Sequence, residues 1–110
     1  MPANKIDPKL VSAIQLSAKY PSIRKMGVFG SHARGDHTHG SDIDILYDYD
    51  DTRILDMLSC LDDISQHVKN KIDFIAYYLL FEDDMSESEK HFRDSILKDV
   101  VWIYEKNTQV

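Results

Sequence analysis

Two aspartates alternate with two isoleucines in the segment SDIDILYDY (residues 41–49), which otherwise has the apolar and aromatic composition of a β-strand. Side chains along a strand point alternately to its two faces. Asp42 and Asp44 are therefore expected on one face, with Ile43 and Ile45 packed on a core at the other. Two carboxylates on one face repel each other, which predicts a raised carboxyl pKa or a cation between them.

Oxygen ligands favour a hard cation such as Mg²⁺, which binds one or two carboxylates together with the phosphates of a substrate. The alternative for an Asp-x-Asp strand is a solvated sheet edge, where charges hinder association with other strands. The residues on both sides of the pair favour the metal site.

Upstream, Gly30 and Ser31 stand where a predicted strand (residues 25–29) gives way to a short helical turn. Backbone N–H groups at such a turn can hold a phosphate, and Arg34 can neutralise it. Downstream, Asp73 lies within a predicted strand over residues 71–77. If that strand pairs with residues 41–49, Asp73 lies across from Asp42 and Asp44, and three carboxylates converge.

The chain reads as helix, strand, helix, strand, helix, strand, helix, which is the element order of an α/β protein. Asp7 caps a first helix that is predicted from Pro8 to about Lys19. After residue 49, Asp51 or Thr52 is expected to cap a helix with an apolar stripe of Ile54, Leu58, Leu61, Ile64 and Val68.

The last helix is predicted to start with a capping box formed by Ser86 and Glu89. Its apolar stripe would consist of Phe92, Ile96, Val100 and Ile103. Trp102 and Tyr104 beside that stripe would belong either to the core or to a docking face.

With 110 residues, the chain is expected to form one domain over residues 1–110. The single cysteine, Cys60, excludes an intrachain disulfide and indicates a reducing compartment. The N-terminal sequence MPANKIDPKL has no apolar signal segment, and no apolar run approaches the roughly 20 residues of a membrane span. We therefore expect a cytoplasmic protein without membrane contact.

The formal net charge of −6 argues against direct binding to nucleic acid, which needs clustered lysine and arginine. An acidic surface suits a basic protein partner, and it serves solubility equally well. A nucleic-acid partner is therefore not expected, whereas a protein partner is left open.

The pattern of Gly30-Ser31, ten residues and then Asp42-x-Asp44, with a later strand aspartate, resembles the minimal nucleotidyltransferases of the DNA polymerase β superfamily. The resemblance implies the nucleotidyltransferase fold, an α/β (α+β) arrangement with a small mixed sheet of about three strands and about four helices. It also implies that the nucleotide is bound by Gly30, Ser31, Arg34 and Ser41, and that two Mg²⁺ ions are held by Asp42, Asp44 and Asp73.

Within that superfamily the chain is most similar to the antitoxins paired with HEPN-domain ribonuclease toxins. The resemblance implies transfer of AMP from ATP to a tyrosine hydroxyl of the toxin, with Asp42, Asp44 and Asp73 as the catalytic residues. Two alternatives are an antitoxin that acts by binding alone and a nucleotidyltransferase for small molecules. His32, His37 and His39 crowd the loop that follows Ser31, and their role is left open.

Overall fold

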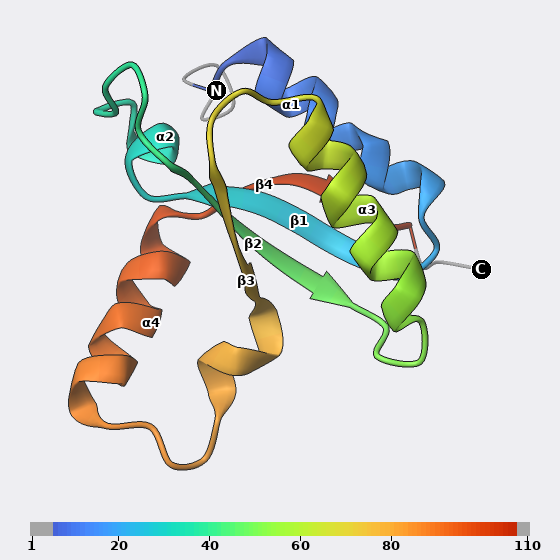
Figure 1. The fold of residues 1–110 in the computed structure, drawn as a ribbon. Coiled ribbons are helices and arrows are strands. Elements are labelled where there is room, and N and C mark those ends of the chain that lie inside the picture. Colours follow the sequence, from blue (N-terminus) through green and yellow to red (C-terminus); the bar gives the residue numbers. More distant parts are fainter. Residues whose placement is uncertain (1–5, 108–110) are drawn as a thin grey trace.

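The structure is a computed structural model that describes residues 6–107. Within these residues, four strands form one sheet in the order β3-β2-β1-β4 (Figure 1). The central strand β1 is antiparallel to β2 and β4, whereas β3 runs parallel to β2, so the sheet is mixed. The strands are β1 (Ile23–Phe29), β2 (Ile43–Tyr49), β3 (Ile72–Ala76) and β4 (Val101–Glu105).

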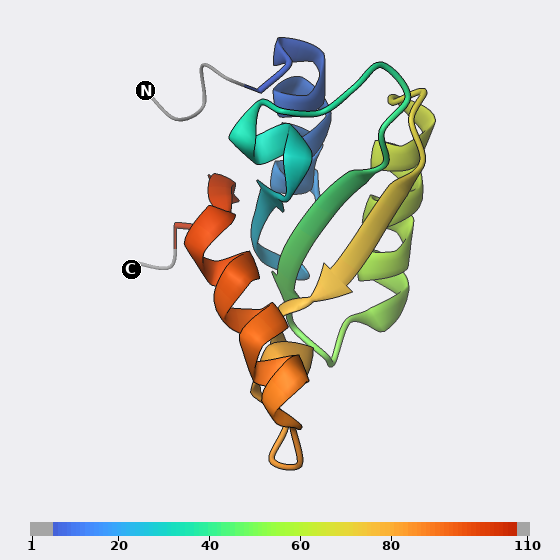
Figure 2. The ribbon, with the colours of Figure 1, turned by 90° about the vertical axis from the view of Figure 1, so that its left-hand side faces the viewer.

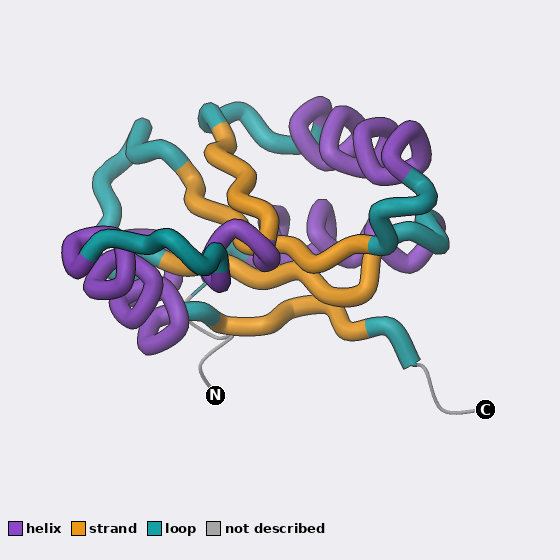
Figure 3. Tube along the Cα trace, turned by 90° about the horizontal axis from the view of Figure 1, so that it is seen from below, coloured by secondary structure: helices purple, strands orange, loops and turns teal. Residues whose placement is uncertain are grey.

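Helices cover both faces of the sheet (Figure 2). One face is covered by α1 (Pro8–Ile14), its 3₁₀ continuation η2 (Gln15–Lys19) and α3 (Ile54–Gln66). The other face is covered by the 3₁₀ helix η3 (Tyr77–Phe81) and α4 (Glu87–Asp99), and the single turn α2 (Ser31–Arg34) follows β1. In Figure 3, α3 and α4 lie on opposite sides of the strands. None of the helices between residues 6 and 107 is long and apolar enough to cross a bilayer.

The larger core lies between the sheet, α1 and α3. Ile43 and Ile45 of β2 belong to it, as predicted, and pack with Ile14 and Ile64, which have no exposed surface. The opposite face carries a second and smaller core of Phe29, Leu46, Leu80 and Ile96. Leu46 lies two residues after Asp44, so the face predicted to hold only carboxylates is polar where β2 begins and apolar further along.

The start of the first and the last predicted helices is confirmed. The Asp7 carboxylate accepts a hydrogen bond from the Lys9 N–H at 2.9 Å, and the helical segment continues to Lys19. In α4, the Ser86 hydroxyl accepts from the Glu89 N–H, and the Glu89 carboxylate accepts from the Ser86 N–H. These side chains satisfy backbone donors that a helix start leaves unpaired.

The predicted end of the last helix is wrong. The helix ends at Asp99, and the chain continues as β4, which pairs antiparallel with β1. Trp102 and Tyr104 therefore lie on a strand rather than a helix, and both are partly buried against the cores, which agrees with the core alternative and not with a docking face on the helix. The pairing is close at Gly27, where a Cβ atom would approach the Val101 carbonyl oxygen to 2.6 Å and the Trp102 ring to 3.0 Å.

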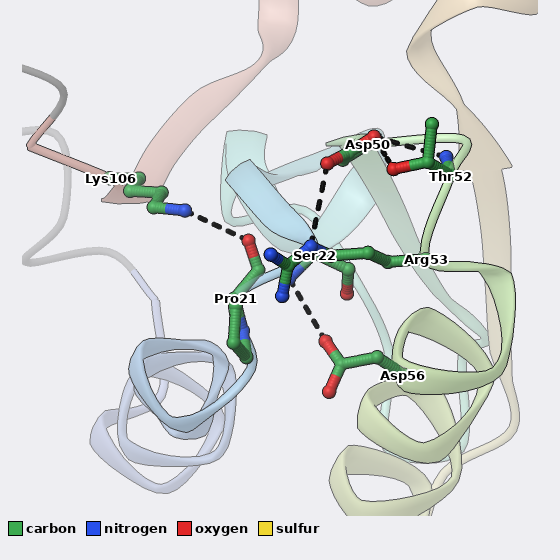
Figure 4. Close-up of polar contacts among 7 residues, drawn as sticks. All are labelled: Pro21, Ser22, Asp50, Thr52, Arg53, Asp56 and Lys106. Carbon is green, nitrogen blue, oxygen red and sulfur yellow. Dashed lines mark hydrogen bonds and ion pairs between the residues drawn. The ribbon is translucent and has the colours of Figure 1, made fainter.

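The prediction for the start of α3 is also wrong. Arg53 occupies the N-cap position, and no side chain caps the helix. Asp50 instead closes the preceding turn, because its carboxylate accepts from the Thr52 N–H at 3.0 Å and from the Thr52 hydroxyl at 2.7 Å. Figure 4 shows this turn beside two further contacts, Ser22 N–H to Asp56 at 2.9 Å and Lys106 to the Pro21 carbonyl at 2.9 Å. These contacts fasten the end of the sheet away from Asp44.

The apolar stripe of α3 differs in part from the prediction. Ile64 is buried as expected, but Ile54 and Leu58 are 49% and 51% exposed. Met57 and Cys60 are buried in their place. Helical spacing therefore identified the helix correctly and its inward face only partly.

Candidate active site

The turn after β1 brings Gly30 against Asp44. Gly30 has φ 75° and ψ −152°, a backbone conformation that is essentially restricted to glycine. A Cβ atom at this position would overlap the carboxylate of Asp44. Phe29, the residue before it, is the β1 partner of Asp44 in the sheet register. Glycine at position 30 thus allows the β1–α2 turn to lie directly on the carboxylate.

Asp73 lies beside Asp44 on the neighbouring strand. The two residues are partners in the parallel register of β2 and β3, so the strand spacing of about 4.8 Å separates their backbones. Asp73 is on an edge strand, its side chain is 46% exposed, and the Lys71 ammonium lies 3.8 Å from its Oδ1. The predicted juxtaposition of Asp44 and Asp73 is therefore present.

The environment of Asp44 favours its neutral form. Burial raises the pKa of the Asp44 carboxyl, and the negative charges of Asp73 and Asp42 raise it further, while His32 and Arg34 partly oppose the shift. Repulsion between carboxylates is what a bound cation would relieve. The shift agrees in direction with the prediction made from the Asp-x-Asp pattern.

Asp44 and Asp73 open into a pocket of about 360 Å³. One wall comes from the sheet and from the turn at Gly30, and the other comes from one side of α4. The lining residues from α4 are Phe92, Ser95, Ile96 and Asp99. The pocket combines carboxylates with an apolar and aromatic wall, which is the character of a small-molecule site.

Arg34 lines the same pocket and is engaged in ion pairs. Its Nη1 donates to Asp99 Oδ2 at 2.7 Å, and its Nε donates to Asp36 Oδ2 at 3.1 Å. The Arg34 side chain is 48% exposed and that of Asp99 is 23% exposed. The guanidinium therefore stands at the pocket, but α4 supplies its anionic partner.

Asp42 and Ser41 belong to the loop that leads into β2. Asp42 precedes β2, is exposed, and lines a separate pocket of about 500 Å³ together with His32, His37 and His39. The Ser41 hydroxyl accepts from the Thr38 N–H at 2.9 Å. Neither residue lines the pocket of Asp44 and Asp73.

The Ser41 carbonyl organises this loop. It accepts hydrogen bonds from His32 Nε2 at 3.1 Å and from Asn70 Nδ2 at 2.9 Å. The His32 ring is buried and stacks on that of His37, with the ring centroids 4.0 Å apart. The contacts of His32 hold the loop between α2 and β2 together.

The oxygen donors fit a hard cation in part. Asp44 and Asp73 supply a carboxylate pair under mutual repulsion. In the chain from residue 6 to residue 107, no three acidic, histidine or cysteine side chains gather into a group that could hold a metal ion by itself. Mg²⁺ commonly takes only one or two carboxylates and completes its shell with water and substrate phosphates. The arrangement suits a cation that arrives with a phosphorylated ligand.

Two residues of the site, Phe92 and Asp99, were missed as site residues by the sequence analysis. Both come from α4, whose packing over the Asp44 face depends on a contact between distant parts of the chain. The predicted apolar stripe of this helix includes Phe92, yet the Phe92 side chain is 56% exposed. No local pattern distinguishes a pocket wall from a core face.

The fold and the carboxylate pocket are those expected of a nucleotidyltransferase domain. Residues 12–109 match the family model described as "Polymerase beta, Nucleotidyltransferase". The chain belongs to this family.

Two similar proteins support the assignment. A protein of Methanocaldococcus jannaschii named "Putative protein adenylyltransferase MJ0126" is 30% identical over 90 residues, which cover 81% of this chain and 84% of that protein. A solved structure titled "Structure of putative minimal nucleotidyltransferase" superposes with a TM-score of 0.60 at 21% identity, covering 84% of this chain and 87% of the other. The second likeness shows the shared mixed α+β nucleotidyltransferase fold, here with four strands rather than the three predicted.

Proposed function

We propose that this protein transfers AMP from ATP to a tyrosine hydroxyl of a HEPN-domain ribonuclease, and so inactivates that toxin as its antitoxin. The observation that carries the proposal is the placement of Asp44 beside Asp73, under the turn at Gly30, in a pocket open to solvent. Membership of the nucleotidyltransferase family supports the reaction class. The protein acceptor is supported by the name of the archaeal relative.

In the reaction, the acceptor oxygen forms a bond to the α-phosphorus of ATP while the bond to pyrophosphate breaks. The hydroxyl proton is lost and pyrophosphate leaves. Catalysis of such a step is mainly positioning of the reacting groups and neutralisation of charge on oxygen. Backbone N–H groups at Gly30 and Ser31 and the guanidinium of Arg34 are the proposed phosphate contacts, and the Ser41 carbonyl holds the adjoining loop.

The acidic residues would hold Mg²⁺. Asp44 and Asp73 are the proposed principal ligands, and Asp42, which lines the separate histidine pocket in the structure, would have to turn toward them to act as the third. Mg²⁺, when bound, supplies positive charge to the phosphate oxygens and lowers the pKa of the attacking hydroxyl. The side chains themselves orient the nucleotide, and Asp73 at the exposed sheet edge can accept the proton of the incoming hydroxyl.

A protein acceptor suits the shape of the site. The pocket opens to solvent beside the sheet edge that carries Asp73, so a side chain of another protein can reach the carboxylates. We therefore infer that the acceptor protein completes the active site. Both proteins would meet in the cytoplasm.

The experiment is intact-mass spectrometry of a HEPN ribonuclease after incubation with this protein, ATP and Mg²⁺. We expect a mass increase of one or more AMP groups, with peptide mapping to a tyrosine, and loss of RNA cleavage. The Asp44→Asn variant is the control and should leave the acceptor unmodified. An acceptor that keeps its mass under all these conditions would rule out the proposed reaction.

Inhibition by binding alone is a second candidate. It is favoured by the exposed apolar side chains of Tyr78, Leu79 and Phe81, which a partner could cover without any transfer of AMP. Under this candidate, a double variant with Asp44→Asn and Asp73→Asn would still inhibit the ribonuclease at equimolar concentration. Under the proposed reaction, the same variant would lose inhibition at catalytic concentrations.

A further inference from the structure

The segment from η3 to α4 projects from the sheet and is poorly buried (Figure 1, Figure 2). Of the 13 residues of α4, only Ile96 is buried. Helices in proteins are stabilised mainly by packing of an apolar face. A helix of this length with one buried residue therefore leaves apolar side chains available for contact with another protein. We call residues 77–92, from the start of η3 to the second turn of α4, the arm.

Aromatic and aliphatic side chains are exposed along the arm. The exposed fractions are 57% for Tyr78, 45% for Leu79, 50% for Phe81 and 56% for Phe92. Phe92 lies one helical turn before Ile96 and lines the pocket of Asp44 and Asp73. Phe92 therefore belongs both to the exposed apolar side chains of the arm and to the lining of the candidate active site.

Acidic residues border this apolar surface where η3 ends. Glu82, Asp83 and Asp84 lie exposed in the loop between η3 and α4, whereas Glu87 at the start of the helix is paired with Lys90 at 3.8 Å. A second copy of this chain, with a net charge of −6, would bring a like charge to this rim. A surface that is apolar at its centre and acidic at its rim is complementary to a basic protein.

We propose that the arm is the docking surface for the protein acceptor, and that the acceptor presents an apolar patch bordered by lysine and arginine next to the hydroxyl that is modified. Phe92 is the anchor, since it belongs to the arm and also lines the pocket. The inference rests on the proposed function for the identity of the acceptor, and it adds where the acceptor binds and which chemistry it offers.

The first test reverses the charge of the rim with Glu82→Lys, Asp83→Lys and Asp84→Lys in the full chain. The probe is the HEPN ribonuclease of the transfer assay, with its affinity measured by isothermal titration calorimetry at low and high salt. We expect the affinity to fall by about tenfold or more at low salt and the difference to shrink at high salt, because exposed charges are screened. ATP binding should be unchanged.

The matched control carries the same change in net charge at exposed positions on α3 and β4, away from the arm, with Ser59→Lys, Asp62→Lys, Ser65→Lys and Glu105→Lys. It should weaken binding far less than the rim variant. An equal loss of affinity in both variants would mean that total charge alone matters, and would overturn the docking surface.

The second test is Phe92→Ala, compared with Leu55→Ala on α3, where Leu55 is 81% exposed on the opposite face of the sheet. Truncation of an anchor residue typically weakens binding by about tenfold or more. We expect KM for the acceptor to rise by that factor with Phe92→Ala and to stay constant with Leu55→Ala. Equal KM values for the two variants would contradict the anchor role.

Separate measurements of acceptor binding and of AMP transfer distinguish the docking surface from the transfer reaction. Acceptor that binds through the arm but receives no AMP would refute the transfer reaction and keep the docking surface. Acceptor that receives AMP with unchanged KM from both the rim variant and Phe92→Ala would refute the docking surface and keep the reaction. A wild-type chain that does not bind this acceptor would refute the docking proposal.

Discussion

The two faces of the sheet are built differently. The face under α1, η2 and α3 is closed by a continuous apolar core that includes Ile14, Ile45 and Ile64. The face under α4 has a core of only Phe29, Leu46, Leu80 and Ile96, and it leaves Asp44 and Asp73 open to a pocket. One face of the sheet thus provides most of the apolar burial. The other buries fewer apolar side chains and leaves two carboxylates accessible.

The largest expected difference between the faces concerns activity, and Asp44→Asn tests it. Removal of one preorganised charged or polar group from a transferase site typically costs a hundredfold to a thousandfold or so in rate. We expect at least about a hundredfold lower transfer of AMP, measured with labelled ATP, while circular dichroism stays the same.

The same variant should be more stable than the wild type at neutral pH. The pKa of the Asp44 carboxyl is raised in the folded state, so the folded chain holds that proton more tightly than the unfolded chain does. The associated stability is present below the unfolded pKa and is lost as the pH rises through the folded pKa. The free energy of unfolding in urea should therefore fall less between acid and neutral pH for Asp44→Asn than for the wild type. A loss of stability at neutral pH would show that Asp44 supports the fold.

The second comparison is of matched core truncations, Ile64→Ala and Ile96→Ala. Both side chains are almost fully buried, one on each face. Such truncations cost about 2–5 kcal/mol, more where the surroundings cannot relax. We expect Ile64→Ala near the upper end, and Ile96→Ala near the lower end because the smaller core borders an open pocket. Equal losses in the free energy of unfolding, measured in urea, would show that the two faces contribute equally to stability.

The third comparison is of Gly30→Ala and Gly40→Ala, two glycines with positive φ. A Cβ atom at Gly30 would overlap the Asp44 carboxylate, whereas a Cβ atom at Gly40 would meet nothing within 4 Å. We expect both to cost on the order of 1–3 kcal/mol of stability from backbone strain. Only Gly30→Ala should also impair ATP binding and transfer. An active Gly30→Ala enzyme would contradict the close approach of the turn to Asp44.

The smallest expected effect comes from Asp99→Asn. The variant removes the anionic partner of Arg34 on α4, so that Asp36 alone remains paired with the guanidinium and more of its N–H donors can bind phosphate. Since exposed ion pairs are worth up to about 1 kcal/mol, KM for ATP should fall by roughly fivefold at most. The control is Asp94→Asn, which removes one charge from the same helix at a position paired with Arg93. An equal change in KM for ATP with Asp94→Asn would show that the loss of one negative charge, and not the release of Arg34, causes the effect.

The sequence predicted what short-range patterns determine. Alternation in SDIDILYDY placed Ile43 and Ile45 in the core, and the strand assignment at residues 71–77 placed Asp73 beside Asp44 once the strands paired in parallel. Each of these followed from the period of a strand. The capping box and the N-caps are equally local, and two of the three predicted helix caps are confirmed, those at Asp7 and Ser86.

What the sequence did not predict depends on contacts between distant residues. Ile96, Val100 and Ile103 fit a helical spacing, while Val100 to Tyr104 also have the β-branched and aromatic composition of a strand. Pairing with β1 at Gly27 decides in favour of the strand after Asp99. The end of α4 at this point places Asp99 against Arg34 and Phe92 at the pocket. The positions of these two site residues therefore depend on the pairing of β4 with β1.

The most direct measurement of the central claim is a titration of the ¹⁵N-labelled protein with ATP and Mg²⁺, followed by NMR. If the open face binds the nucleotide, chemical shifts should change at Gly30, Ser31, Asp44 and Asp73 and stay constant at Met57 and Ile64. The changes should disappear in the Asp44→Asn, Asp73→Asn double variant. Shift changes confined to the face under α1 and α3, or unaltered in the double variant, would contradict the account.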